Sequence, residues 1–219
     1  MSADQSLKGT VTIRPLRLNE LPAAAAAFAE SFRQEGFTRA LLNLATPRRV
    51  QRFAVFTEFV LLLYYYSGHK VLVATQGGVP AGVAIVKLAG AEPRASWLQR
   101  ATVPVRYGLP LLGMAGIIRW RNALQVKSAI KPPAALPAAY RTLEIIAVAP
   151  GFQGQGIGRA LLEHLNAECD SDSDTPGIYL YTADEKNTHI YRRFGYEVLQ
   201  VKQGGPVSVW QMFRPRTTG

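Results

Sequence analysis

The sequence contains very little cysteine chemistry, since Cys169 is the single cysteine among 219 residues. One cysteine cannot form an intramolecular disulfide, and thiolates cannot assemble a zinc site here. The histidines, His69, His164 and His189, lack partners at metal-ligand spacing, so we expect no metal. This composition suits a reducing compartment, and we expect a cytoplasmic protein.

Long hydrophobic runs are also missing. The two most apolar stretches, Phe59 to Tyr66 and Tyr107 to Ile118, are much shorter than the roughly 20 residues of a membrane-spanning helix. Residues 1–8 lack the apolar core of a signal peptide. We therefore expect neither a membrane span nor secretion.

Acidic residues are scarce, with 15 Asp and Glu against 25 Lys and Arg, a formal net charge of +10. Such a charge attracts anionic ligands, including phosphorylated cofactors and nucleic acid. The basic residues are scattered, however, and form neither a basic helix nor an aromatic-basic stripe. We expect no nucleic-acid partner, and a generally basic surface is an equally good interpretation of the charge.

The length and the 48% hydrophobic content are sufficient for one core, so we expect residues 1–219 to form a single domain. A strand is predicted from Val11, with Pro15 at a sheet edge. Asn19 is the predicted N-cap of a helix that runs to about Phe32. Thr46-Pro47 predicts the start of a second, long helix that ends before Gly68.

The middle of the chain is predicted less regularly. Val71 to Thr75 and Val79 to Lys87 flank Gly77-Gly78 and predict a β-hairpin. Residues from about 90 to 139 contain six prolines and no clean periodicity, which indicates an insertion. Its apolar part, Tyr107 to Trp120, predicts one or two short helices over a cleft or against a partner.

Regular patterns return after Arg141. Leu143 to Val148 predicts a buried strand, and a glycine-rich turn leads from it into an amphipathic helix that contains Leu161 and Leu165. The remaining predicted elements are a strand at Ile178 to Thr182, a helix from about Asn187 to Phe194 that ends at Gly195, and a hairpin of Tyr196 to Val201 with Val207 to Phe213.

The glycine-rich turn is the clearest binding motif. Small residues at 154, 156 and 158 leave backbone N–H groups accessible, and the dipole of the following helix favours an anion such as a pyrophosphate. Arg159 stands where a P-loop needs Lys-Ser or Lys-Thr, and the dinucleotide spacing G-x-G-x-x-G is also absent. The alternative is a tight turn that only packs the helix onto the strand.

The turn resembles the Q/R-x-x-G-x-G/A motif of the GNAT N-acetyltransferase superfamily. Leu143 to Pro150 resembles the fourth strand of that family, and Ile178 to Thr182 resembles the fifth. Asn187, Tyr191 and Phe194-Gly195-Tyr196 match its N-x-x-x-x-Y-x-x-x-G-F/Y signature. The resemblance covers about the last 75 residues strongly and the earlier elements weakly.

The resemblance implies a mixed α/β fold (α+β mixed), with a mostly antiparallel sheet, splayed fourth and fifth strands, and helices on its faces. It implies acetyl-CoA as cosubstrate, with the pantetheine arm paired to the main chain of Ile146, Ala147 and Val148. The implied pyrophosphate site comprises Gln153, Gly154, Gln155, Gly156, Ile157, Gly158 and Arg159. Asn187 is expected to hydrogen-bond the cofactor arm, or alternatively to cap a helix.

Two side chains are candidates for proton transfer. A phenol can protonate a departing thiolate, and Tyr191 is the candidate general acid, unless it only packs its helix on the sheet. Glu144 interrupts an apolar strand, where it could take the amine proton or form a structural ion pair. Strand periodicity places Thr142, Glu144 and Ile146 on one face. The resemblance assigns the oxyanion contact to the Ile146 N–H.

These residues predict an N-acetyltransferase that moves acetyl directly from acetyl-CoA to a primary amine. Acidic neighbours raise the thiol pKa of Cys169, which argues against an acyl-cysteine intermediate. A small-molecule acceptor is favoured and a protein amine remains open, as does a homodimer. Trp97, Tyr107 and Trp120 indicate an apolar acceptor site. The alternative is a non-catalytic CoA-binding or protein-interaction module of the same fold.

Overall fold

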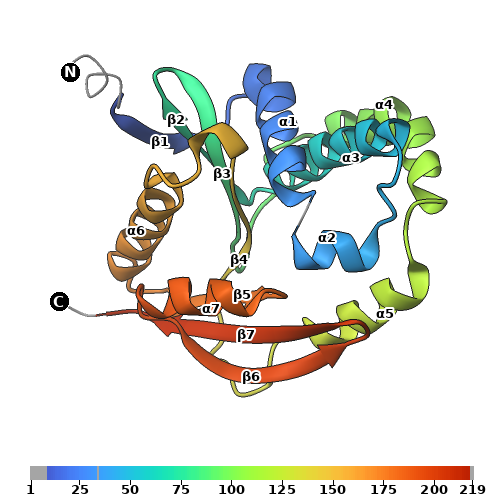
Figure 1. The fold of residues 1–219 in the computed structure, drawn as a ribbon. Coiled ribbons are helices and arrows are strands. Elements are labelled where there is room, and N and C mark those ends of the chain that lie inside the picture. Colours follow the sequence, from blue (N-terminus) through green and yellow to red (C-terminus); the bar gives the residue numbers. More distant parts are fainter. Residues whose placement is uncertain (1–8, 34, 218–219) are drawn as a thin grey trace, which may run out of the picture.

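The computed structural model describes residues 9–33 and 35–217, with only part of the side chains in the helix at residues 97–115. The described residues form a seven-stranded sheet in the order β1-β2-β3-β4-β5-β7-β6 (Figure 1). Neighbouring strands are antiparallel, except that β4 and β5 are parallel. The strands are β1 (Val11–Pro15), β2 (Lys70–Gln76), β3 (Val79–Lys87), β4 (Arg141–Val148), β5 (Gly177–Thr182), β6 (Glu197–Gly204) and β7 (Val207–Pro215).

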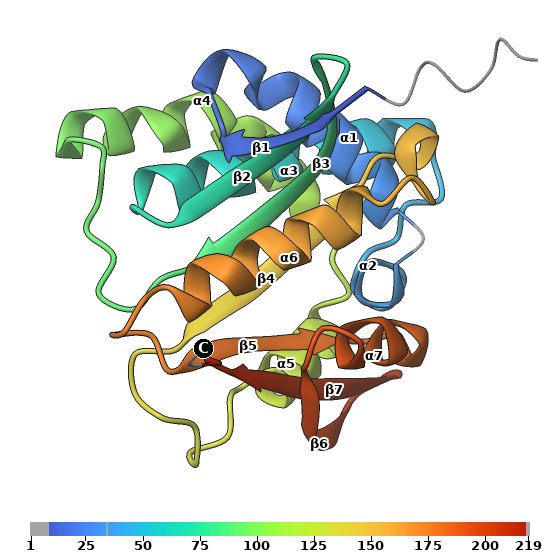
Figure 2. The same cartoon turned by 90° about the vertical axis from the view of Figure 1, so that its left-hand side faces the viewer.

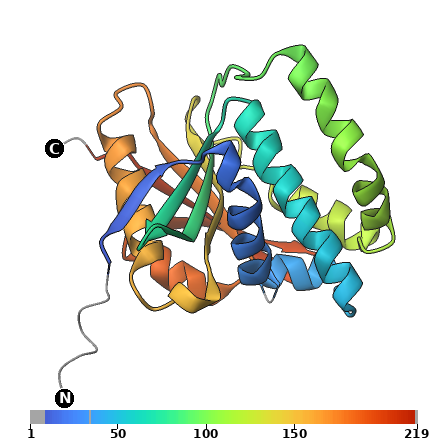
Figure 3. The same cartoon turned by 90° about the horizontal axis from the view of Figure 1, so that it is seen from above.

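Helices cover both faces of the sheet (Figures 2 and 3). On one face lie α1 (Leu21–Phe32) and α3 (Pro47–Tyr66), and α4 (Trp97–Ala115) packs against α3. On the opposite face α6 (Ile157–Asp170) covers the sheet, and α7 (Glu185–Arg192) lies against β5 and β6. The remaining helices are α2 (Gly36–Leu41), α5 (Trp120–Ala129), and the short 3-10 turns Leu18–Glu20 and Pro150–Phe152. This arrangement confirms the expected mixed α/β fold.

The pairing of β4 with β5 is short. It begins at Arg141 opposite Ile178 and ends at Leu143 opposite Leu180. On its other edge, β4 remains paired with β3 as far as Val148. The two parallel strands therefore splay apart after Leu143, and one edge of β4 is left without a strand neighbour.

An extra residue in β4 lies at the point where the strands separate. Ile85 of β3 is opposite Ile145, but the next β3 residue, Val86, is opposite Leu143. Glu144 thus has no partner in the ladder and forms a β-bulge. A bulge bends its strand and changes which face the following side chains occupy, so the predicted period of two does not continue through this site.

The helix α6 sits very close to the sheet. Its apolar side chains Leu161 and Leu165 are fully buried against the strands. A Cβ atom at Gly82 of β3 would lie 2.8 Å from Cγ2 of Ile157 and 3.2 Å from Cδ1 of Leu161, so only glycine permits this approach. This close packing fixes the position of the first residues of α6 and of the glycine-rich turn that leads into them.

Several predicted boundaries agree with the structure. The strand β1 lies at the sheet edge and ends at Pro15. Thr46 caps α3, with its Oγ1 accepting from Arg49 N at 3.4 Å, and the helix ends before Gly68. Gly195 has a φ of +85°, which favours glycine, but α7 spans Glu185–Arg192 and so starts and ends two residues before the predicted helix.

Other boundaries were predicted wrongly. Asn19 lies in the 3-10 turn, and Glu20 occupies the N-cap position of α1. Helix α2 was not predicted. The proline-containing segment was expected to form short helices, yet α4 spans 19 residues. Its start is fixed by a capping box between Ser96 and Gln99, and α4 is stabilised by packing against α3, which local propensity does not report.

No helix within the described residues is long and apolar enough to cross a membrane. The two apolar stretches of the sequence instead form parts of α3 and α4, which face each other in the folded protein. Their hydrophobicity is used for packing between helices and against the sheet.

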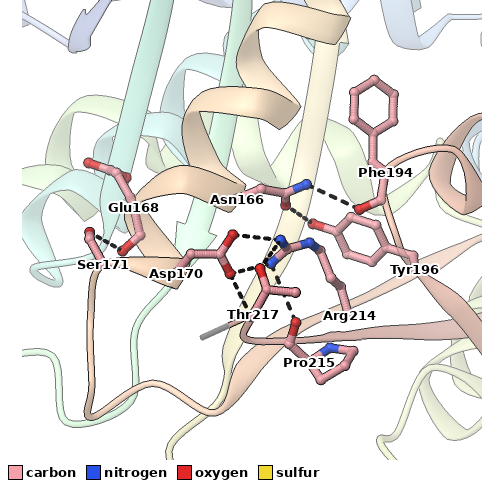
Figure 4. A network of polar contacts seen from close by, with 9 residues as sticks. All are labelled: Asn166, Glu168, Asp170, Ser171, Phe194, Tyr196, Arg214, Pro215 and Thr217. Carbon is pink, nitrogen blue, oxygen red and sulfur yellow. Dashed lines mark hydrogen bonds and ion pairs between the residues drawn. The ribbon is translucent and has the colours of Figure 1, made fainter. Parts of the chain in front are cut away.

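A polar network ties the end of α6 to the last strand (Figure 4). Both guanidinium Nη atoms of Arg214 donate to Asp170, Nη1 to Oδ1 at 2.8 Å and Nη2 to Oδ2 at 2.6 Å. Thr217 N donates to the same carboxylate at 2.9 Å. These donors hold the pKa of Asp170 well below its usual range, chiefly through the Arg214 hydrogen bonds. The network joins the α6 side of the molecule to the β5–β7 side.

Asp170→Asn should lower the free energy of unfolding by about 2–3 kcal/mol at pH 7, because Arg214 would remain largely buried without a counter-charge. Because the folded pKa of Asp170 is depressed, its contribution is complete above the unfolded pKa of about 3.9 and is lost as the pH falls towards the folded pKa. Urea denaturation at pH 7 and at about pH 2.5 measures both effects.

The matched control is Asp174→Asn, which changes an exposed carboxylate in the following loop and should alter the stability by less than about 0.5 kcal/mol. Equal stability of the Asp170 and Asp174 variants at pH 7 would contradict a structural role for the network.

Candidate active site

The splay between β4 and β5 opens a cavity of about 210 Å³ that we call the central cavity. Its walls come from β4, β5, the end of α1, the residues before α2, and α7. Glu144, Tyr181, Asn187 and Tyr191 contribute the polar side chains considered below. The central cavity therefore exists because the two parallel strands stop pairing at Leu143.

The main chain of β4 presents alternate amides to this cavity. Ala149 N–H donates to the β3 residue Ala81 at 2.9 Å, so Ala147, two residues earlier, also pairs towards β3. By the same alternation, the N–H and C=O groups of Ile146 and Val148 point to the open edge. Ile146 and Val148 can thus pair with an extended ligand, whereas the main chain of Ala147 is engaged with β3.

A second hollow, the cofactor groove, adjoins the central cavity on the α6 side and measures about 510 Å³. The glycine-rich turn forms its floor, with Gly154 at φ +74° and Gly156 at φ +84°. These left-handed glycines turn successive amides towards the start of α6, where the helix dipole favours negative charge. Among the described residues, no acidic side chain lines the groove, and Arg159, which lines it, forms an ion pair with Glu163 at 2.7 Å.

The predicted pyrophosphate residues divide into two groups. Gln153, Gly154, Gly156, Ile157, Gly158 and Arg159 line the cofactor groove. Gln155 does not line it, because its Nε2 donates back to the carbonyl of Gly151 at 2.9 Å. Gln153 Nε2 donates to Val148 O at 3.3 Å and so fixes the turn to the end of β4.

Asn187 lies on α7 at the junction of the groove and the central cavity. Its Nδ2 donates to Thr182 Oγ1 at 3.3 Å, which anchors α7 to the end of β5. The alternative interpretation of Asn187 as a helix cap is wrong, since the Asp184 side chain caps α7 by accepting from Lys186 N. The Asn187 side chain remains directed towards the junction.

Tyr191 lies one helical turn after Asn187 and also lines both the groove and the central cavity. Its ring packs edge-on against Tyr196, with the centroids 5.8 Å apart, so the predicted packing role is real. No described residue forms a hydrogen bond with its hydroxyl group. Burial, with a smaller effect from Glu35, raises the pKa of Tyr191 above its usual range, so burial favours the neutral phenol.

Glu144 does not share a face with Ile146, contrary to the strand periodicity. The bulge places Ile146 and Leu143 in the core on the α6 side, whereas Ile145 packs with the α1 side. Glu144 lines the central cavity, and its Oε2 accepts from the Tyr181 hydroxyl at 2.8 Å. Burial and the Glu144 charge raise the pKa of Tyr181 well above its usual range, so Tyr181 acts here as a hydrogen-bond donor.

Glu35 is a site residue that the sequence did not reveal. Its Oε2 accepts from Phe37 N at 2.8 Å and Thr38 N at 3.2 Å, so it caps α2. It also lines the central cavity, and burial raises the pKa of its carboxyl group despite these hydrogen bonds. A sequence signal existed in the acidic residue before Gly36, but α2 itself has no periodic pattern.

A third hollow of about 370 Å³, the apolar pocket, adjoins the central cavity on the α1 side. It lies between α1, α2, α3 and α5, and Trp120 is part of its wall. Tyr107, also predicted to line an acceptor site, is instead buried and donates to Glu58 at 2.6 Å. The side chain of Trp97 lies outside the described residues. The cofactor groove, the central cavity and the apolar pocket are thus adjacent, in this order, across the gap between β4 and β5.

Three solved structures that the chain resembles are acetyltransferases. The chain aligns with the histone acetyltransferase HPA2 and related acetyltransferase of Corynebacterium glutamicum at 17% identity and a TM-score of 0.67, covering 96% of this chain and 98% of that one. It aligns with the ribosomal-protein-S18-alanine N-acetyltransferase of Escherichia coli at 19% identity, a TM-score of 0.54, and 96% and 97% coverage. At these identities, the alignments establish the fold.

A third structure, the PaiA N-acetyltransferase of Thermoplasma acidophilum in complex with coenzyme A, aligns at 11% identity and a TM-score of 0.57, with 94% of this chain and 99% of that chain covered. No curated protein sequence matches the chain. The acetyltransferase (GNAT) domain model matches residues 113–198, from the end of α4 through β4, the glycine-rich turn and α7 into β6. The match covers 86 of the 219 residues, so the chain resembles the GNAT acetyltransferase family over that stretch and has the fold of the aligned acetyltransferases.

Proposed function

We propose that the protein transfers an acetyl group from acetyl-CoA directly to a primary amine. The observation that carries the proposal is the junction between the cofactor groove and the central cavity. Ile146, Val148, Asn187 and Tyr191 line both hollows. A thioester whose phosphates bind at the glycine-rich turn would therefore have its reacting carbon beside these residues.

The open edge of β4 supports a binding mode for the extended arm of the cofactor. Ile146 and Val148 have no strand neighbour on this edge and could pair with the two amide groups of a pantetheine chain, as a further strand would, with the Val148 carbonyl also accepting from Gln153. Gly154, Gly156 and the start of α6 would hold the pyrophosphate. The Ile146 N–H, which follows the bulge, would then stabilise the oxyanion.

Two groups are suitably placed for the proton transfers. The amine nitrogen attacks the thioester carbonyl, the C–N bond forms, and the C–S bond breaks. Glu144 would accept the proton that the amine loses, directly or through water, and Tyr191 would donate a proton to the departing thiolate. Cys169 is 0% exposed within the core, so the described side chains give no support for an acyl-cysteine intermediate.

Tyr191→Phe should lower kcat by about 100-fold or more, because loss of a general acid typically costs a factor of 10² to 10⁴. The ring and its contact with Tyr196 remain, so the affinity for acetyl-CoA and the stability should change little. Steady-state kinetics of CoA-thiol release and isothermal titration calorimetry measure these quantities.

Tyr140→Phe is the matched control, since Tyr140 packs against Tyr179 away from the central cavity and should tolerate the change. A Tyr191 variant as active as the control would remove Tyr191 as the acid. If acetyl-CoA binds but no amine is acetylated, the protein is better described as a non-catalytic CoA-binding module.

Gly156→Ala should weaken acetyl-CoA binding by about tenfold. A non-glycine residue at its φ of +84° costs roughly 1–2 kcal/mol, and relaxing that strain would rotate amides away from the phosphates. The dissociation constant from calorimetry checks the prediction. Gly151→Ala is the control, because a Cβ there meets open space without a positive φ, and its affinity should be that of the wild type.

A further inference from the structure

The apolar pocket is positioned to hold the part of the acceptor that does not react. Its wall is largely aromatic and aliphatic, with Phe28, Phe32, Phe37, Phe53, Phe56 and Trp120 among its residues. Its volume of about 370 Å³ is at the lower end of the range of roughly 300–1,000 Å³ for small-molecule sites. The pocket thus has the size and lining for a compact apolar group.

Two carboxylates mark the boundary between the apolar pocket and the central cavity. Glu35 and Glu144 line both hollows, so they lie where a group entering from the pocket reaches the reaction centre. Among the described residues, no Lys, Arg or His side chain lines either hollow. A positive charge at this boundary would therefore be stabilised without a competing cation.

Each of these carboxylates has one oxygen available. Glu35 uses Oε2 to accept from the two α2 amides, and Glu144 uses Oε2 to accept from Tyr181. The Oε1 atoms of both residues have no hydrogen-bond donor among the described residues. An ammonium group has three donors and can satisfy both oxygens.

The rest of the pocket wall cannot supply the hydrogen bonds that a polar ligand needs. Apart from Glu35 and Glu144, its side chains with polar atoms are Thr38, Trp120 and Tyr181; the Trp120 N–H already donates to Ala115 O and the Tyr181 hydroxyl to Glu144. A sugar or polyamine in this space would bury hydroxyl or amino groups without partners, which is unfavourable. An apolar group would instead gain from leaving water.

We infer that the acceptor is a small primary amine with an apolar body, an aryl or branched alkyl group that a short linker joins to the nitrogen. The apolar pocket holds the body, and Glu35 and Glu144 hold the ammonium until Glu144 takes its proton. This inference rests on the proposed function, because it names the second substrate of the same reaction. Glu35 is then the residue that selects a cationic nitrogen.

The experiment compares amines on the purified full-length chain with saturating acetyl-CoA. The apolar amines are 2-phenylethylamine and 3-methylbutylamine, and the polar ones are glucosamine, spermidine and an alanine-ended tripeptide. CoA-thiol release gives kcat/KM, and calorimetry on the CoA-loaded protein gives amine affinity without turnover. We expect kcat/KM for the apolar amines to exceed that for the polar ones by about 100-fold.

Ala123→Phe tests the pocket itself. Ala123 lines the pocket from α5, and a phenyl ring there would occupy the space of the ligand body. We expect KM for 2-phenylethylamine to rise about tenfold or more, with KM for acetyl-CoA unchanged. The control is Leu124→Phe at the adjacent, 67% exposed position, which should leave both KM values unchanged.

Glu35→Gln tests the selecting carboxylate. Glutamine retains an oxygen that can accept from the α2 amides, so the cap persists while the charge is lost. We expect KM for the amine to rise about tenfold, with a smaller change in kcat, because a charge-assisted hydrogen bond to the ammonium is lost. Glu30→Gln, at an exposed position of α1, is the control.

The outcomes separate this inference from the proposed function. If polar amines or the peptide are acetylated while the apolar amines neither bind nor react, the function stands and the acceptor class is wrong. If the apolar amines bind the CoA-loaded protein but no amine reacts, the pocket assignment is supported and the proposed reaction fails. If nothing binds or reacts although acetyl-CoA binds, both are overturned.

Discussion

The site depends on a single constraint, the end of β4–β5 pairing at Leu143 together with the extra residue Glu144. If the parallel ladder continued, the amides of Ile146 and Val148 would bond to β5, and no cavity would separate the strands. The bulge also directs Glu144 and Ile145 away from the face of Ile146. The end of one ladder and the bulge in the other thus supply an open edge, an unpaired amide and a carboxylate at one place.

An open edge within a sheet needs support from elsewhere, because unpaired amides and a short ladder stabilise it weakly. The two sides of the splay are joined at one end by Arg141 and Asp172, 2.6 Å apart, and by the Asp170–Arg214 pair. At the other end, Asn187 anchors α7 to Thr182, and Gln153 anchors the glycine-rich turn to Val148. The Asp170–Arg214 pair thus links α6 to β7, whereas the contacts of Asn187 and Gln153 each stay within one side of the splay.

The sequence revealed those parts of the molecule that are encoded locally. Thr46-Pro47, Gly77-Gly78 and the glycine-rich turn each act through a few neighbouring residues, and their predictions agree with the structure. The bulge at Glu144 depends instead on the partner strand β3, and Glu35 enters the site because α1 and α2 pack beside β4. Helix α4 is stabilised over its length by contacts with α3. Its prolines therefore led to a wrong prediction of short helices, because local propensity does not include those contacts.

The hollows open on opposite faces of the sheet. The cofactor groove lies among residues of α6 and α7, and the apolar pocket lies among residues of α1, α3 and α5. If both substrates occupy these hollows, they approach the reaction centre from opposite directions and need not pass each other. The two substrates would then enter the central cavity from different sides.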